Sequence, residues 1–164
     1  MNNKDYGRDV NFYSGNSAVQ IKAVITEKNV KSVNVTVTKK GISGKFFEDG
    51  SRLTIQLDVC EMVELSKLIM QWHKNKNHFE AGYHGKSKCK VLYVNLNKKD
   101  GDLDKINFTI IDKTTEIGQI SVNIDKKAVF EIAQILLERI SLNANATITD
   151  TLNLFQITDK RQNL

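Results

Sequence analysis

Polar side chains that bind anions or form amide hydrogen bonds recur at every second position of several short segments. They are Gln20, Lys22, Asn34, Thr36, Thr38, Arg52, Thr54 and Gln56 in the first half of the chain, and Lys88, Lys90, Asn107, Thr109, Gln119, Ser121 and Asn123 in the second. Lys and Arg bind phosphate groups, and the amides and hydroxyls can bind bases and sugars. These positions include no carboxylate, although an ordinary solvated surface mixes both signs of charge. The pattern favours a polyanionic ligand.

Aromatic side chains near these segments offer surfaces on which unpaired bases can stack. Tyr13 and Tyr83 open the first strand of each half of the chain at equivalent positions, and Phe46 or Phe47 and Tyr93 are further candidates. The alternative is that each tyrosine covers the edge of the core. We predict a nucleic-acid-binding surface with the following residues: Tyr13, Gln20, Lys22, Lys39, Lys45, Arg52, Tyr83, Lys88, Lys90 and Asn107.

The residue types that carry most enzymatic chemistry do not form a recognisable set. His73, His78 and His84 lack the accompanying Glu or Cys spacing of a metal site. Residues 41–44 lack the spacing of a phosphate-binding Walker loop. Glu64 and Glu131 recur at equivalent helix positions, but solvated helix faces explain them more simply. Without a nucleophile, base and orienting residue, we expect no enzymatic activity, no cofactor and no metal.

The elements that position these side chains occur twice, with a period of about 70 residues, longer than that of most solenoid repeats. Residues 53–58 and 120–125 each run into a helical pattern, and the two segments align without a gap. Residues 33–37 correspond to 106–110, and residues 13–17 to 83–87. Each unit therefore has its strands first and its helix last.

Alternation of apolar and polar residues predicts the individual strands. In the first unit we expect strands at 18–26, 33–38, 45–47 and 52–57 and a helix at 59–74, whose first turn has a capping box between Asp58 and Glu61. In the second unit we expect strands near 87–97, 104–112 and 117–124 and a helix near 126–141. The fold class is α+β: tandem β-β-β-β-α repeats, with antiparallel sheets and helices packed on one face.

We expect one domain over residues 17–142, built from repeats 17–75 and 83–142, because two separate halves of this size would each bury a thin core. Residues 1–16 are expected to form a flexible arm. The tail, 143–164, is expected to be an extra strand or a segment that docks on a partner subunit. Two sets of residues should face the helices, namely Leu53, Ile55 and Leu57 and also Ile120, Val122 and Ile124.

Composition is ordinary for a folded protein: of 164 residues, 40% are hydrophobic and 26% are charged. The net charge of +5 gives a basic balance that fits either a polyanionic partner or a solvated surface without one. Cys60 and Cys89 are expected to be small core residues in a reducing compartment. The N-terminus lacks a signal-peptide pattern and no apolar run reaches the length of a membrane span, so we expect a cytoplasmic or nucleoid-associated protein without membrane contact.

Two β-β-β-β-α units with a basic polar sheet face resemble the single-stranded-DNA-binding transcriptional regulator superfamily. Its members include the Whirly proteins, the Pur-alpha repeats, the general transcriptional coactivator domain and the guide-RNA-binding proteins of kinetoplastid mitochondria. The resemblance covers residues 17–142 and lies in architecture and repeat spacing. The Lys-Gly-Lys-Ala-Ala-Leu motif of the Whirly family is absent, and residues 40–45 match it only distantly.

The resemblance implies sequence-tolerant binding of single strands, of DNA in preference to RNA, through basic contacts and aromatic stacking. It also implies a homo-oligomer, either a dimer or a tetramer. The alternative function is a protein-interaction or assembly module without a nucleic-acid ligand. An exposed apolar patch would favour that alternative.

Overall fold

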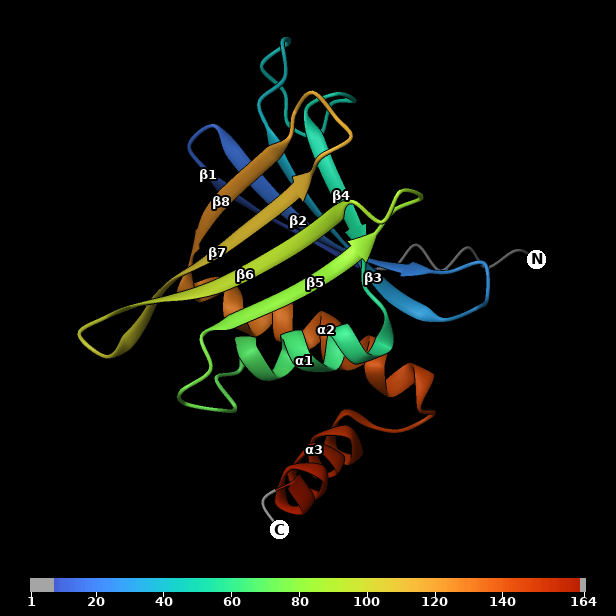
Figure 1. Ribbon diagram of the computed structural model, residues 1–164. Coiled ribbons are helices and arrows are strands. Elements are labelled where there is room, and N and C mark those ends of the chain that lie inside the picture. The colour runs from blue at the N-terminus through green and yellow to red at the C-terminus, as the bar shows by residue number, and fades with distance from the viewer. Residues whose placement is uncertain (1–7, 163–164) are drawn as a thin grey trace.

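The structure, a computed structural model, describes residues 8–162 and contains two four-stranded sheets and three α-helices (Figure 1). The elements in chain order are β1 (Asp9–Ser14), β2 (Ser17–Ile25), β3 (Lys31–Lys39), β4 (Arg52–Gln56), α1 (Val59–Ile69), β5 (His78–His84), β6 (Lys90–Lys99), β7 (Asp102–Asp112), β8 (Gln119–Asp125), the short 3-10 helix η1 (Lys126–Ala128), α2 (Val129–Asn143) and α3 (Ile148–Gln162).

Each sheet is an antiparallel meander in which every strand pairs with its neighbour in sequence. The first sheet has the order β1-β2-β3-β4 and the second has the order β5-β6-β7-β8. A helix follows the last strand of each sheet, α1 after β4 and α2 after β8. The predicted α+β class with repeated ββββα units is therefore confirmed.

The apolar faces of the two sheets share one core. β8 contacts all four strands of the first sheet, and β4 contacts β6, β7 and β8. A strand that touches every strand of another sheet must run across them, so the sheets cross rather than align. Helices α1 and α2 close the side on which the sheets separate (Figure 1).

The helices tie the two repeats together. α2, from the second repeat, packs on β2 and β3 of the first sheet, and α1, from the first repeat, contacts β5 of the second. The predicted inward residues Leu53, Ile55 and Leu57 are buried in this core together with their counterparts Ile120, Val122 and Ile124. The strand register was thus predicted correctly for β4 and β8.

The start of α1 has the predicted capping box. An Asp58 side-chain oxygen accepts a hydrogen bond from the Glu61 backbone N–H at 2.8 Å, and the Glu61 carboxylate accepts one from the Asp58 N–H at 2.9 Å. The helix ends at Ile69 rather than at residue 74. Gln71 has a φ of 53°, a left-handed conformation that cannot continue a right-handed helix.

Three strand predictions were wrong. Residues 9–14, expected to lie in a flexible arm, form β1, and residues 78–84, where no strand was expected, form β5. Residues 1–7 of that arm lie outside the described part of the chain. Residues 45–47, expected to be a strand, form part of the β3–β4 loop. In the first repeat the missed β1 takes the place of the strand that does not exist, and in the second repeat β5 raises the three expected strands to four.

The C-terminal segment is a helix and not a strand, which was one of the two predicted alternatives. In α3, Phe155 is buried and packs edge-on against Trp72, with ring centroids 5.9 Å apart. Asp159 pairs with Lys67 of α1 at 2.9 Å and accepts a hydrogen bond from the Trp72 indole N–H. The segment therefore docks on its own chain.

Cys60 is exposed on α1 and Cys89 is half-buried just before β6, so the prediction that both are core residues was wrong. Within the described residues, no helix combines the length and the apolar character that crossing a membrane requires.

Candidate nucleic-acid interface

The outward face of the first sheet carries rows of polar residues that run across its strands. Pairing aligns Asp9, Lys22, Asn34 and Gln56 in one row, Asn11, Gln20, Thr36 and Thr54 in the next, and Tyr13, Ala18, Thr38 and Arg52 in the third. The outward residues predicted for residues 18–57 all lie on this side of the sheet, but Thr36 and Thr38 are buried rather than exposed as predicted. Strand β1 adds Asp9, Asn11 and Tyr13 to it.

Hydrogen bonds between neighbouring strands hold these side chains in place. The hydroxyls of Thr36 and Thr54 lie 2.8 Å apart, and Gln20 donates to Asn11 at 3.0 Å and to Asp9 at 3.2 Å. A side chain that is already ordered loses less conformational entropy when it binds a ligand. The face is therefore partly organised for binding before a ligand arrives.

Charge on this face is mixed and is less purely basic than predicted. Lys22 is exposed, and no ion pair to it occurs among the described residues. Arg52 pairs with Asp49 at 2.7 Å, an exposed interaction that competes weakly with a phosphate. Asp9 lies on the same face, so the expectation that the face lacks carboxylates was wrong. The error follows from the missed β1.

Lys39 and Lys45 lie beside the face rather than within its rows. Lys45 is exposed on the β3–β4 loop, and this loop crosses the sheet where the Phe47 backbone N–H donates to the Thr38 hydroxyl at 3.1 Å. Lys39 is exposed at the end of β3 and lines a groove of about 500 Å³. Ser121 of the second sheet lines the same groove, so Lys39 stands where the two sheets meet.

The outward face of the second sheet is dominated by amides. Pairing aligns His78, Asn95, Asn107 and Asn123 in one row and Glu80, Tyr93, Thr109 and Ser121 in the next. Asn107 donates to Asn123 at 3.1 Å and to the Ser121 hydroxyl at 2.9 Å, and it accepts from Thr109 at 3.0 Å. Asn107 is thus at the centre of this network.

Lys90 does not belong to the outward face. It has the same parity as the inward residues Leu92 and Val94, and its ammonium lies 3.8 Å from the Asp112 carboxylate and 3.4 Å from the Thr54 carbonyl oxygen. The strand starts at Lys90, whereas the prediction started it at residue 87 and placed Cys89 inward. The predicted alternation is therefore shifted by one residue from that of the structure, and a shift of one residue inverts the face of every side chain.

Asp112 explains why Lys90 is held in place. The Thr114 hydroxyl donates to this buried carboxylate, and together with the Lys90 ammonium it lowers the pKa of Asp112 below its ordinary value despite burial. Lys90 is therefore a structural residue. Lys88 is exposed in the β5–β6 loop with a φ of 52°, outside any strand.

The two tyrosines are exposed, so neither covers the core edge as the alternative required. Tyr13 is 61% exposed, and its ring lies beside that of Phe46 in the β3–β4 loop, with centroids 5.2 Å apart. Tyr83 is 83% exposed. Both lie at the end of their strands, β1 and β5, rather than at the start. Their equivalence in the two repeats was predicted correctly.

Sequence reasoning missed the aromatic and ionisable residues that β5 brings to the second face. The rings of His78 and Tyr93 stack with centroids 5.8 Å apart, and Glu80 lies in the row beside them. The signal was present, because Phe79 and Ala81 alternate with His78 and Glu80. Only Phe79 and Ala81 of this seven-residue strand are buried, and alanine is small, so the alternation was weak among the polar residues around it.

Solved structures share this architecture. WHY1 from Arabidopsis thaliana matches with a TM-score of 0.60 and 12% sequence identity, over 83% of this chain and 84% of that one. Trypanosome MRP1/MRP2 (Trypanosoma brucei) match with a TM-score of 0.57 and 10% identity, over 84% of this chain and 85% of theirs.

The chain has a Whirly-like fold. Sequence identity this low establishes the fold alone. No protein-family model matches the sequence, and a search of curated proteins found no match. The fold expected from the repeat spacing thus agrees with the fold of these solved structures. In it, β4 and β8 are the last strands of their sheets, so the polar rows on them lie at equivalent positions.

Proposed function

We propose that the protein binds single-stranded nucleic acid in a sequence-tolerant manner, DNA in preference to RNA. The observation that carries the proposal is the outward face of the first sheet, where rows of hydrogen-bonded amides and hydroxyls lie between exposed cations and the exposed ring of Tyr13. The Whirly-like fold supports it, because the superfamily that the sequence resembles binds single strands across its sheets.

Each group has a part in such binding. Lys22, Arg52, Lys45 and Lys88 would contact phosphates, the amides would contact sugars and base edges, and Tyr13 and Tyr83 would stack on unpaired bases. Contacts of this kind tolerate any sequence because every base has a π-face and every nucleotide has a phosphate. From the resemblance we also propose a homo-oligomer, whose mass light scattering would measure.

Removal of four cations tests the proposal. The quadruple variant Lys22→Ala, Lys45→Ala, Arg52→Ala, Lys88→Ala should bind labelled single strands more weakly. Its affinity should also fall less steeply with salt concentration (a smaller salt slope), because fewer phosphate contacts form and fewer counterions are released on binding. Fluorescence anisotropy at about 50 and about 200 mM salt measures both quantities. The melting temperature should hardly change, since these side chains are exposed.

A matched variant removes the same charge elsewhere. Lys74, Lys126, Lys127 and Lys160 are exposed on or beside the helices, and their replacement by Ala should leave most of the affinity and most of the salt slope. If both quadruple variants lose affinity equally, net charge and not this surface is responsible. Undiminished binding by the first variant would move the surface elsewhere.

One observation favours the alternative of a protein partner. Phe130 is 73% exposed on α2, and Leu154 and Ile157 are about half exposed on α3. Such residues occur at protein contacts. They lie on the helices rather than on the outward sheet faces, so a protein contact there is compatible with nucleic acid on the sheets. Absence of any salt-sensitive binding to single strands would leave this alternative as the better proposal.

A further inference from the structure

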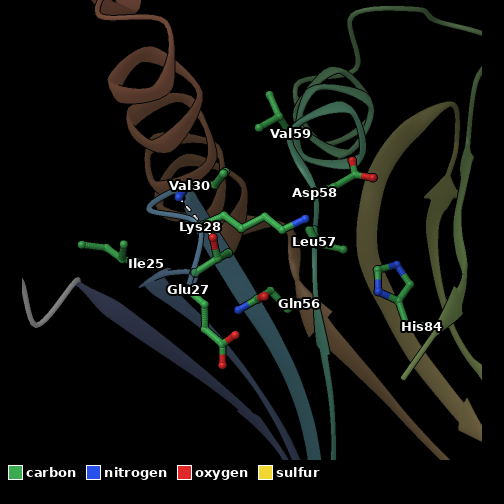
Figure 2. A pocket seen from close by; sticks show the side chains of 10 residues that line it. Ile25, Glu27, Lys28, Val30, Gln56, Leu57, Asp58, Val59 and His84 are labelled. Carbon is green, nitrogen blue, oxygen red and sulfur yellow. Dashed lines mark hydrogen bonds between the residues drawn. The ribbon is translucent and has the colours of Figure 1, made fainter. Parts of the chain in front are cut away.

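A cleft of about 670 Å³ lies at one end of the first sheet, within the range of roughly 300–1,000 Å³ of small-ligand sites. The β2–β3 hairpin forms one wall, and the end of β4, the start of α1 and His84 form the other (Figure 2). Gln56 lines the cleft and also shares a row with Lys22 on the outward face. The cleft therefore opens where the proposed interface ends.

His84 presents a hydrogen-bond acceptor. Its Nε2 lies 2.8 Å from a carboxylate oxygen of Glu61, whose other oxygen accepts the Asp58 backbone N–H of the capping box. A carboxylate has no proton to donate, so Nε2 carries the hydrogen. In the neutral form of the ring, Nδ1 has a lone pair, and no partner for it occurs among the described residues.

Gln56 adds a second acceptor. Its Nε2 donates to the Asn34 side-chain oxygen at 3.3 Å, which leaves the Oε1 atom without a partner in the described part of the chain. Apolar side chains of Val30, Leu57 and Val59 line the cleft beside it. Figure 2 shows Lys28 extending from the hairpin toward β4, between Gln56 and Asp58.

These groups match a planar ring that donates hydrogen bonds. Glu27 and Asp58 also line the cleft, and two carboxylates disfavour a phosphate. Resting on the proposed function, we infer that the cleft binds one amino-bearing nucleobase (cytosine, adenine or guanine) of the strand that crosses the first sheet. The apolar wall packs on the ring. Uracil and thymine are disfavoured because they have a carbonyl where cytosine has an amino group. That carbonyl would face the acceptors of Gln56 and His84, with which it cannot form a hydrogen bond.

Strands of oligodeoxycytidine and oligodeoxyuridine test this preference, because cytosine has an amino group at ring position 4 where uracil has a carbonyl. With labelled strands of about 16 nucleotides, the full chain should bind the cytidine strand roughly two- to ten-fold more tightly, the effect of one hydrogen bond. Gln56→Leu and His84→Phe should each reduce that ratio by weakening the cytidine strand alone. Gln56 is exposed, so its variant keeps the fold even if the loss of His84 affects the Glu61 cap.

Gln20→Leu is the matched control, since Gln20 has the same side chain on the same face outside the cleft. It should change binding of both strands alike and leave the ratio intact. Equal affinities of the unaltered chain for the two strands, or a ratio that persists in both cleft variants, would overturn the inference. Either result leaves salt-sensitive binding of both strands in place, whereas failure of the proposed function would abolish it.

Discussion

Tyr83 combines 83% exposure with a backbone φ of 63°. A bulky residue in this left-handed region costs about 1–2 kcal/mol, and no core packing offsets that cost. We predict that Tyr83→Ala lowers the affinity for single strands about ten-fold, the effect of losing one base-stacking ring. Its melting temperature should stay the same, because alanine has the same backbone strain and the ring covers no core. Melting and binding measured on one preparation check this; a lower melting temperature with unchanged affinity would contradict it.

For individual residues, the sequence predicted the direction of the side chain well wherever apolar and polar residues alternate strictly. Val33, Val35 and Val37 alternate with polar residues, and Asn34, Thr36 and Thr38 lie on the outward side as expected. Lys90 was misplaced because the residues before it, 86–89, contain no large apolar side chain that could set the parity. The pairing of Lys90 with Asp112 depends on β7 and could not be derived from local pattern.

Among the elements, α3 docks through Phe155 and through one carboxylate, that of Asp159. Asp159 accepts hydrogen bonds from Lys67 and Trp72 and lies 3.5 Å from the His73 imidazole. We predict that Asp159→Asn destabilises the docked helix by about 1.5–3 kcal/mol, as expected for hydrogen bonds to a charged group. Trp72 is the only tryptophan of the chain, so its fluorescence reports the docking directly. Glu138→Gln, an exposed change on α2, is the control and should leave that fluorescence unaltered.

The same contact gives a pH dependence. The Lys67 ammonium, with the Trp72 N–H, lowers the pKa of Asp159 from its ordinary value of 3.8. A carboxylate with a depressed folded pKa stabilises fully above its unfolded pKa and loses that contribution as the pH falls through the folded value. Trp72 emission should therefore change below about pH 4. Asp159→Asn should lack this step; an identical acid transition in both proteins would show that Asp159 is not its cause.

Local pattern failed for α3 because its sequence is rich in Thr, Asn and Asp, which are poor helix formers. Tertiary contacts of Phe155 and Asp159 supply what propensity lacks. A usable signal existed in the Thr147–Asp150 spacing. The Thr147 hydroxyl accepts from the Asp150 N–H at 3.1 Å, and Asp150 accepts in return, as in a capping box.

For the whole molecule, the cross-covering helices predict that neither repeat folds alone. Without α2, the first sheet would expose its inward face on β2 and β3, and without α1 the second repeat would lose its cover at β5. We expect residues 1–75 and 76–164, expressed separately, to melt without a cooperative transition and to recover one when mixed. Circular dichroism measures this against the full chain. A sharp transition in an isolated half would indicate two domains instead of the single one that we propose.

The crossing of the two sheets has a mechanical consequence. Their outward faces point away from one shared core, and Lys39 stands at the junction where Ser121 of one sheet meets the end of the other. A polymer that touches both faces must curve around an object only a few nanometres wide. Duplex DNA, with a persistence length of about 50 nm, resists such curvature. A supple single strand does not, so bending stiffness alone would separate one form of nucleic acid from the other before any base is contacted.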